Sequence, residues 1–328
     1  MRKTENDFYG PAREWLIRFV LEQRLLGFRY TGSALAYWRA LDHFFSEESS
    51  KFPVMDQDQY ERFVALRPGQ SSQHQRNLAS RWKAFALFLN RHGKKAFVPE
   101  SCEMPIFRQD FVPDIYTRAQ IAALFNAAES LPAPRRSQSA WLHSMMKILL
   151  RVLYGTGMRV GETLTLACDD FDFDSGVITV QSGKGCKKRI IPLAPGLSKL
   201  LIRWKGERLA KGQPLLFPSI RIDGAVSHNA MYRLFKDQLL PVAGLPPRLT
   251  RQGPRLHDLR HTFAVHRLEN WFRAGEDIEA KLPYLAAYLG HTHLQDTYYY
   301  LRLTMSFFPE IGRRLQSRGV RFPEGGRP

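Results

Sequence analysis

The spacing of apolar positions predicts a helical domain in the first hundred residues. Apolar side chains recur three or four positions apart there, which places them on one face of an α-helix. Many of them are aromatic, and we expect these rings, Trp38 and Trp82 among them, to form a core rather than to stack on nucleic-acid bases. The predicted helices cover residues 11–27, 32–47, 57–66 and 71–91.

A second pattern begins after residue 113 and mixes helices with short strands. Thr117 and Gln120 have the spacing of a capping box that opens a helix. Residues 177–181 and 189–193 are strand-like and flank the glycine-containing turn SGKGCKK. Further helices are expected at residues 140–154, 229–240, 257–274 and 276–289. The predicted fold class is therefore mainly α with a small β-sheet in the second domain (α+β).

The helical periodicity fails between residues 93 and 113, where Pro99, Pro105 and Pro113 accumulate. We therefore expect a helical domain over residues 1–100, a linker over 101–114 and a second domain over 115–316. The last residues, 317–328, are expected to be disordered.

Charge indicates a polyanionic partner. The 328 residues include 48 Lys and Arg against 31 Asp and Glu, a net charge of +17. Residues 1–112 have 17 basic and 13 acidic side chains, and residues 113–328 have 31 and 18, so most of the excess lies in the second part. Anionic metabolites and membrane surfaces remain alternative partners at this point.

Other compositional features exclude several classes of protein. The three cysteines are too few and too scattered for a disulfide framework or a zinc module. No apolar run is long enough to span a membrane, and the first residues lack the apolar segment of a signal peptide. We therefore expect a location in the reducing cytoplasm.

Four groups of basic and aromatic residues along the chain are candidates for a functional site. Arg159 with Glu162 follows a glycine-rich turn, and Lys184 lies in the predicted hairpin. Helical spacing puts His257, Arg260 and His261 on one side of a helix, where they could bind an anion or transfer protons. The fourth cluster is Leu289-Gly-His291 followed by Tyr298, Tyr299 and Tyr300. The alternatives without a function in chemistry are a structural Arg–Glu pair for the first group, a solvated lysine for the second and an exposed basic helix face for the third.

Metal and nucleotide cofactors are not expected. His257 with Asp258, or His291 with His293, could ligate a cation, but the neighbouring arginines and lysine would repel it. No H-E-x-x-H, C-x-x-C, P-loop or dinucleotide-binding motif occurs in the sequence.

Taken together, the four clusters resemble the tyrosine recombinase, or phage-integrase-type, family. The resemblance covers roughly residues 8–308 and rests on the order Y-G-T-G-M-R-V-G-E, G-K-G, H-D-L-R-H-T-F-A, L-G-H and a tyrosine nine residues beyond that histidine. Each motif is weak alone, whereas the order and spacing of the series are specific.

The resemblance implies a role for each matching position. Arg159 and Arg260 would bind the non-bridging oxygens of the scissile phosphate, and His257 and His291 would hydrogen-bond it and help to move protons. Lys184 would protonate the leaving 5′ oxygen. Tyr300 would attack phosphorus and form a 3′-phosphotyrosyl bond. Glu162 and His261 would support these groups.

The family also implies a clamp on double-stranded DNA that contains specific recombination sites. Residues 1–100 would be a core-binding domain and residues 115–316 a catalytic domain, acting as a homo-tetramer on two sites. Candidate DNA-contacting residues are Lys94, Lys95, Lys187, Lys188 and Arg189. The alternatives are a type IB topoisomerase-like enzyme and a non-catalytic DNA-binding protein of the same fold.

Overall fold

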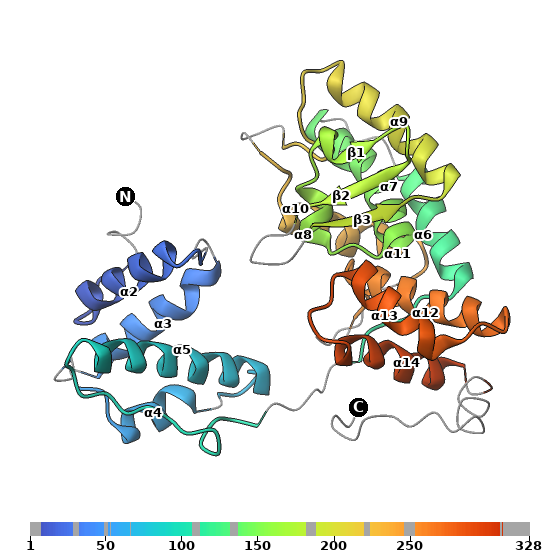
Figure 1. Cartoon of the computed structure of the whole chain (residues 1–328). Helices are drawn as coiled ribbons and strands as arrows, with labels where there is room; N and C mark the ends of the chain where they lie inside the picture. Colours follow the sequence, from blue (N-terminus) through green and yellow to red (C-terminus); the bar gives the residue numbers. More distant parts are fainter. Residues whose placement is uncertain are drawn as a thin grey trace. The chain divides into compact units, whose positions relative to one another are not determined.

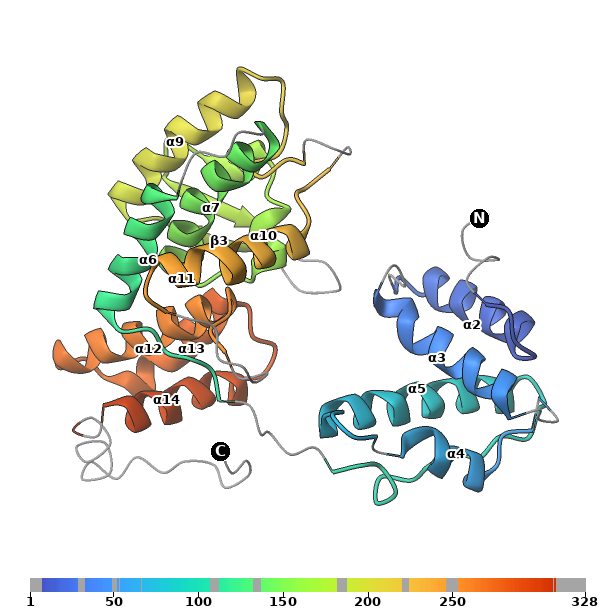
Figure 2. The same cartoon turned by 180° about the vertical axis from the view of Figure 1, so that it is seen from behind.

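The chain divides between Asp110 and Phe111 into two units (Figures 1 and 2). The computed structural model describes residues 8–28, 33–48, 52, 54–65, 67–106, 112–131, 137–181, 188–219, 224–245, 253–308 and 310. The expected disordered tail, residues 317–328, lies outside the described residues.

Aromatic side chains hold the first unit together. Trp38, Phe45, Trp82 and Phe85 are fully buried in one cluster, which confirms the prediction that these rings form a core. Two helices begin at side-chain caps, because Asp56 accepts a hydrogen bond from the backbone N–H of Gln59 and Ser71 accepts one from that of His74. The helices are α2 (Arg13–Leu25), α3 (Ser33–Glu47), α4 (Gln57–Val64) and α5 (Ser72–Arg91).

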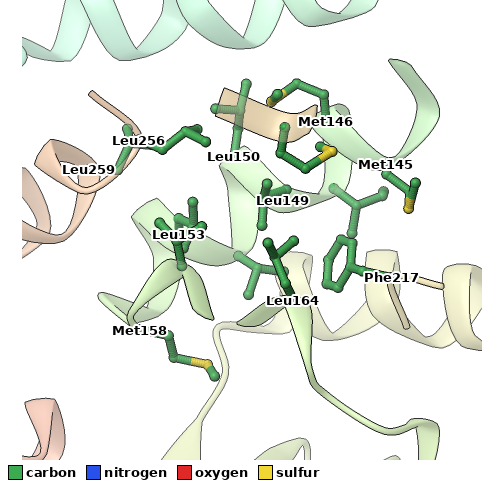
Figure 3. Close-up of a cluster of buried hydrophobic side chains, with 14 of the residues drawn as sticks. Met145, Met146, Leu149, Leu150, Leu153, Met158, Leu164, Phe217, Leu256 and Leu259 are labelled. Carbon is green, nitrogen blue, oxygen red and sulfur yellow. The ribbon is translucent and has the colours of Figure 1, made fainter. Parts of the chain in front are cut away.

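Helix α7 (Ser137–Thr156) is the central element of the second unit. Its buried side chains, including Leu149, Leu150 and Leu153, meet Phe217 and Leu259 from distant segments (Figure 3). Helix α6 (Arg118–Ser130) packs beside α7 and begins at the predicted capping box of Thr117 and Gln120. The shape of this core fixes where α7 ends, and the first cluster of candidate residues follows directly after it.

A small antiparallel sheet lies in the same unit. Its strands, in spatial order, are β1 (Phe171–Asp172), β2 (Val177–Val180) and β3 (Arg189–Pro192). Ile178 lies opposite both Phe171 and Ile191, and all three are buried. The two predicted strands are therefore confirmed, and β1 adds a short third strand at the edge.

Helices α12 (Asp258–Arg273), α13 (Ile278–Leu289) and α14 (Gln295–Phe307) form a group that Figure 1 shows together. Leu268, Leu282 and Leu301 are buried between them, and α12 also packs on α7. Helix α13 ends where Gly290 adopts a left-handed conformation with φ of 70°, which reverses the chain toward α14.

The predicted helix at residues 229–240 differs from the observed structure. Helix α10 (His228–Leu234) changes into a π-helical turn, η2 (Phe235–Leu239), before the short α11 (Leu240–Val242). Such turns insert a residue into the helical repeat, which periodicity alone does not reveal. Helix α9 (Pro195–Leu209) was not expected as a separate element, and the short α8 (Val160–Leu164) begins directly after the glycine-rich turn.

No helix in the described part of the chain combines the length and the apolar character needed to cross a bilayer.

Candidate active site

The carboxyl end of α13 gathers three arginines. The last carbonyl groups of a helix have no partner within it and are at the negative end of its dipole, so guanidinium donors bind them well. Three consecutive carbonyls each accept a hydrogen bond from a different arginine. The pairs are Tyr288 with Nε of Arg189 (3.1 Å), Leu289 with Nη2 of Arg260 (2.8 Å), and Gly290 with Nη2 of Arg159 (3.3 Å).

Glu162 neutralises two of these arginines. Its Oε1 accepts from Nη1 of Arg159 at 2.9 Å, and its Oε2 accepts from Nη2 of Arg189 at 2.6 Å. The backbone N–H of Arg159, at the start of α8, also donates to Oε2. Although burial opposes ionisation, the hydrogen bonds from both arginines lower the pKa of Glu162 to about 2. Glu162 is therefore an anion that fixes Arg159 and links α8 to β3.

Arg260 lies at the centre of the cluster and is almost completely buried. Its Nη1 donates to the carbonyl of Gly157 at 2.8 Å, and its Nη2 lies 2.9 Å from Nε2 of His291. The guanidinium also lies near enough to Tyr300 for its charge to favour the ionised phenol. Helix α12 supplies Arg260 in its first turn, so the packing of α12 on α7 determines this position.

Tyr300 is the buried member of the three consecutive tyrosines. Its side chain is 3% exposed, whereas Tyr298 and Tyr299 are partly exposed. Its ring stacks on His291 with 5.7 Å between ring centroids and lies 5.5 Å from His261. Burial raises the pKa of Tyr300, and the charge of Arg260 opposes this rise. In the absence of another ligand the phenol is therefore protonated at neutral pH.

Three histidines in the cluster have lowered pKa values. Partial loss of hydration and the charge of Arg260 lower the pKa of His257 to about 4, although part of its side chain remains exposed to solvent. Burial lowers the pKa of His261 to about 3 and that of His291 to about 4, with Arg260 adding to both shifts. All three rings are therefore neutral at pH 7 and can donate or accept a hydrogen bond.

The sequence-predicted residues fall into two groups. The structure brings together Arg159, Glu162, His257, Arg260, His261, His291 and Tyr300. Lys184 and Lys187 lie outside the described residues. Lys95 and Lys188 are exposed, Lys94 is half-buried beside Trp15, and none of the three belongs to the cluster.

The structure corrects the expectation that Arg189 faces DNA. Its side chain is only 10% exposed, and its donors bind Glu162 and the carbonyl of Tyr288. No signal in the sequence distinguishes a basic residue of a strand that points toward solvent from one that points into the protein.

Sequence reasoning also missed Thr297 and the close approach of Arg189 to Gly290. Oγ1 of Thr297 lies 2.8 Å from Nδ1 of His291, and Thr297 is completely buried. A Cβ at Gly290 would lie 2.9 Å from Nη1 of Arg189. The position of Thr297, one helical turn before Tyr300, is the only signal in the sequence that could have identified it.

Within the described residues, His, Cys, Asp and Glu side chains form no group of three or more with an arrangement suited to a metal ion. The charged groups at the centre of the cluster are instead guanidiniums. Guanidiniums in such an arrangement are suited to hold a phosphate through charge-assisted hydrogen bonds.

A helical fold with a small sheet, in which three arginines and three histidines surround a buried tyrosine, has the features of a tyrosine recombinase. The chain belongs to the Phage integrase family, whose profile matches residues 115–306, and this family acts in DNA recombination and integration.

Two curated relatives and one solved structure illustrate the similarity. The putative integrase/recombinase y4rB of Sinorhizobium fredii (strain NBRC 101917 / NGR234) is 31% identical over 246 residues, which cover 72% of this chain and 76% of that protein. Tyrosine recombinase XerC of Xanthomonas campestris pv. campestris (strain B100) is 25% identical over 296 residues, or 90% of this chain and 83% of the relative. The Tn1549 transposon integrase in complex with transposon right end DNA has the same fold, with a TM-score of 0.60, 16% identity, and coverage of 90% of this chain and 99% of that one.

Proposed function

We propose that this protein is a site-specific DNA recombinase that cuts and rejoins duplex DNA through Tyr300. The phenol oxygen attacks a backbone phosphorus, forming a 3′-phosphotyrosyl bond and releasing a 5′-hydroxyl. The observation that supports this best is the position of Tyr300, which stacks on His291 beside the buried guanidinium of Arg260, so that the charge of Arg260 acts on the phenol. A phosphate bound by this guanidinium would then lie next to the nucleophile.

The two arginines supply the positive charge that the reaction needs. The transition state of phosphoryl transfer has negative charge on its equatorial oxygens, and fixed cations stabilise it. Arg159 uses Nη1 and Nη2 for Glu162 and Gly290, and its side chain is 44% exposed, so its remaining N–H donors can bind an incoming phosphate. Arg260 is more enclosed and would bind the same phosphate from the side of Tyr300.

Proton transfer would complete the reaction. The raised pKa of Tyr300 means that the phenol must lose its proton during attack, since a protonated phenol is a weak nucleophile. His257, neutral and partly open to solvent, is a suitable acceptor beside Arg260. Lys184, in the segment between β2 and β3, would donate a proton to the leaving 5′ oxygen.

The proposed partner is double-stranded DNA with specific recombination sites, bound by a homo-tetramer. Residues 1–100 would bind the core of each site, residues 101–114 would connect the domains, and residues 115–316 would contain the catalytic centre. The net charge of +17 supports a polyanionic partner. Lys94, Lys95, Lys187 and Lys188 remain proposed phosphate contacts, and Arg189 is no longer one of them.

Covalent capture tests the proposal and does not require the sequence of the recombination site. The full chain is incubated with a pool of nicked duplexes that have a randomised 30-base-pair segment, and DNA that stays attached after boiling in SDS is recovered and sequenced. Wild-type protein should retain DNA attached at its 3′ end, and Tyr300→Phe should retain none. Tyr298→Phe and Tyr299→Phe are matched controls, because each removes one hydroxyl from the same helix.

Each outcome of this experiment has a clear meaning. Equal adducts with wild type and Tyr300→Phe would assign the nucleophile elsewhere. If wild type formed no adduct but bound the duplexes, the chain would be a DNA-binding protein without strand-breaking activity. If it relaxed supercoiled plasmid without pairing two sites, the topoisomerase-like alternative would hold.

A further inference from the structure

Helix α5 differs in charge from the other helices that the structure describes in the first unit. Its 20 residues include Arg76, Arg81 and Lys83 but no Asp or Glu. Helices α2, α3 and α4 each contain at least one acidic residue. Because acidic side chains are repelled by the phosphates of DNA, α5 is the helix of this unit that is best suited to approach a duplex.

The first half of α5 has a polar ridge formed by Gln73, Asn77 and Ser80. Positions that are four and three residues apart lie on one face of a helix. Gln73 and Ser80 are exposed, and Asn77 is half-buried beside Tyr37 of α3. The ridge therefore presents amide and hydroxyl groups, which are the groups that hydrogen-bond base edges without adding charge.

Hydrogen bonds within the first unit hold the amide of Asn77. Its Nδ2 donates to the hydroxyl of Tyr37 at 3.1 Å, and its Oδ1 accepts from Nε2 of Gln73 at 2.9 Å. A side-chain amide has two N–H donors and two lone pairs on its oxygen. Among the contacts of the described residues, Asn77 therefore keeps one N–H and one lone pair for another molecule.

We infer that Asn77 determines part of the DNA sequence specificity by binding an adenine in the major groove, and that Tyr37 and Gln73 are its positioning residues. The inference rests on the proposed function, which makes duplex DNA the partner. The major groove is wide enough for an α-helix, and an asparagine amide matches N6 and N7 of adenine with one donor and one acceptor. Those are the two groups that Asn77 has left.

The test is a selection for binding, in which the full chain recovers duplexes from the randomised pool and their sequences are compared. Wild-type protein should prefer adenine at one position of the selected sequence. Asn77→Ala should lower this preference about 5- to 150-fold, the range for one bidentate contact to a base. Preferences at the other positions should not change, since Asn77 contacts one base pair.

Asn77→Asp is a sharper variant, because a carboxylate only accepts hydrogen bonds and pairs with N4 of cytosine. Tyr37 and Gln73 can both donate to that carboxylate, so the side chain stays in place. The preferred base at the same position should change from adenine to cytosine. Asn90→Asp is the matched control, since it adds the same charge to α5 at an amide whose Oδ1 already accepts from the backbone N–H of Ala96.

Tyr37→Phe tests the positioning contact. It keeps the ring but removes the hydroxyl that accepts from Asn77. The preference for adenine should weaken at the position that Asn77→Ala identifies and nowhere else. A merely structural role would instead lower the affinity for all duplexes by the same factor. Circular dichroism checks that each variant is folded.

The inference fails if Asn77→Ala and Asn77→Asp select the wild-type sequence with wild-type strength. It also fails if Asn77→Ala weakens binding to every duplex equally, which would assign Asn77 to the DNA backbone. Should Asn77→Asp not fold, Asn77→Ala and Tyr37→Phe still decide. The selection needs no strand cleavage, so adducts that survive Tyr300→Phe would overturn the proposed chemistry while the base preference of Asn77 stands.

Discussion

Nη2 of Arg189 donates a hydrogen bond to Oε2 of Glu162 at 2.6 Å, across 27 residues of sequence. The side chains are 10% and 17% exposed, so the ion pair is largely shielded from water. Because the same carboxylate also holds Arg159, this pair connects the sheet to the candidate phosphate-binding arginine.

Replacing Glu162 should destabilise the protein strongly. Glu162→Gln leaves Arg189 buried without a counter-charge, and removing one partner of such a pair lowers the free energy of unfolding by about 3 kcal/mol. Arg189→Met should restore part of this loss in the double variant, since no uncompensated charge then remains. Urea denaturation of the four proteins measures the coupling. If the losses of the two single variants simply add in the double variant, Glu162 and Arg189 are not energetically coupled, which would contradict a shielded ion pair.

Gly290→Ala should be more destabilising than Gly275→Ala. Both glycines have left-handed φ angles, 70° and 75°, so both alanines cause a similar backbone strain. Only at Gly290 would the new Cβ meet Nη1 of Arg189, whose guanidinium is held by Glu162 and cannot move freely. We expect Gly290→Ala to melt several degrees below Gly275→Ala in thermal denaturation. Equal melting temperatures would indicate that Arg189 relocates without loss.

Stability should fall as the pH is lowered from 7 to 5. The pKa values of His257 and His291 in the folded protein are about 4, and that of His261 is about 3, whereas all three are near 6.5 when unfolded. The unfolded chain therefore binds more protons below pH 6.5, and the stability gained from neutral rings is lost as the pH falls. Glu162 contributes little in this window, because its pKa is near 4.5 in the unfolded chain and about 2 in the folded protein, and both values lie below pH 5.

The pH effect can be assigned with one variant. His261→Leu removes a ring whose Nδ1 has no hydrogen-bond partner among the described residues, so no hydrogen bond of this atom is lost, and leucine keeps an apolar side chain beside Tyr300. Its free energy of unfolding should depend less steeply on pH between 7 and 5 than that of wild type. The raised pKa of Asp258 acts in the opposite direction, but Asp258 is present in both proteins, so the comparison isolates His261. An unchanged slope would show that His261 titrates normally.

DNA binding should depend steeply on salt. Each phosphate neutralised by the protein adds about −0.9 to the slope of log affinity against log salt concentration. Lys95→Gln, at an exposed proposed contact, should make the slope less steep by about 1 on a non-specific 30-base-pair duplex. Lys281→Gln is the control, since Lys281 is already paired with Glu276. Fluorescence anisotropy at several salt concentrations measures the slope for both variants. If Lys95→Gln and Lys281→Gln change the slope equally, Lys95 is not a phosphate contact.

Local sequence patterns predicted most helices and strands, because the signals that begin and continue these elements arise from residues close together in the sequence. The capping box at Thr117 and the periodicity around Trp82 each arise within a few residues, and the structure has both helices. The π-helical turn at Phe235–Leu239 escaped prediction, since the surrounding apolar spacing still resembles that of an uninterrupted α-helix.

By itself, the sequence determined the helical character of both parts, the two main strands and the order of Arg159, Arg260, His291 and Tyr300. Only the tertiary structure decided how these residues meet. Arg260 reaches Gly157 across 103 residues, and Arg159 reaches Gly290 across 131. Those contacts follow from the packing of α12 on α7 and from the unpaired carbonyls at the end of α13, and neither depends on spacing along the chain. The same packing turned Arg189 inward and brought Thr297 to His291, because burial of a polar group requires a partner and the fold determines which one is near.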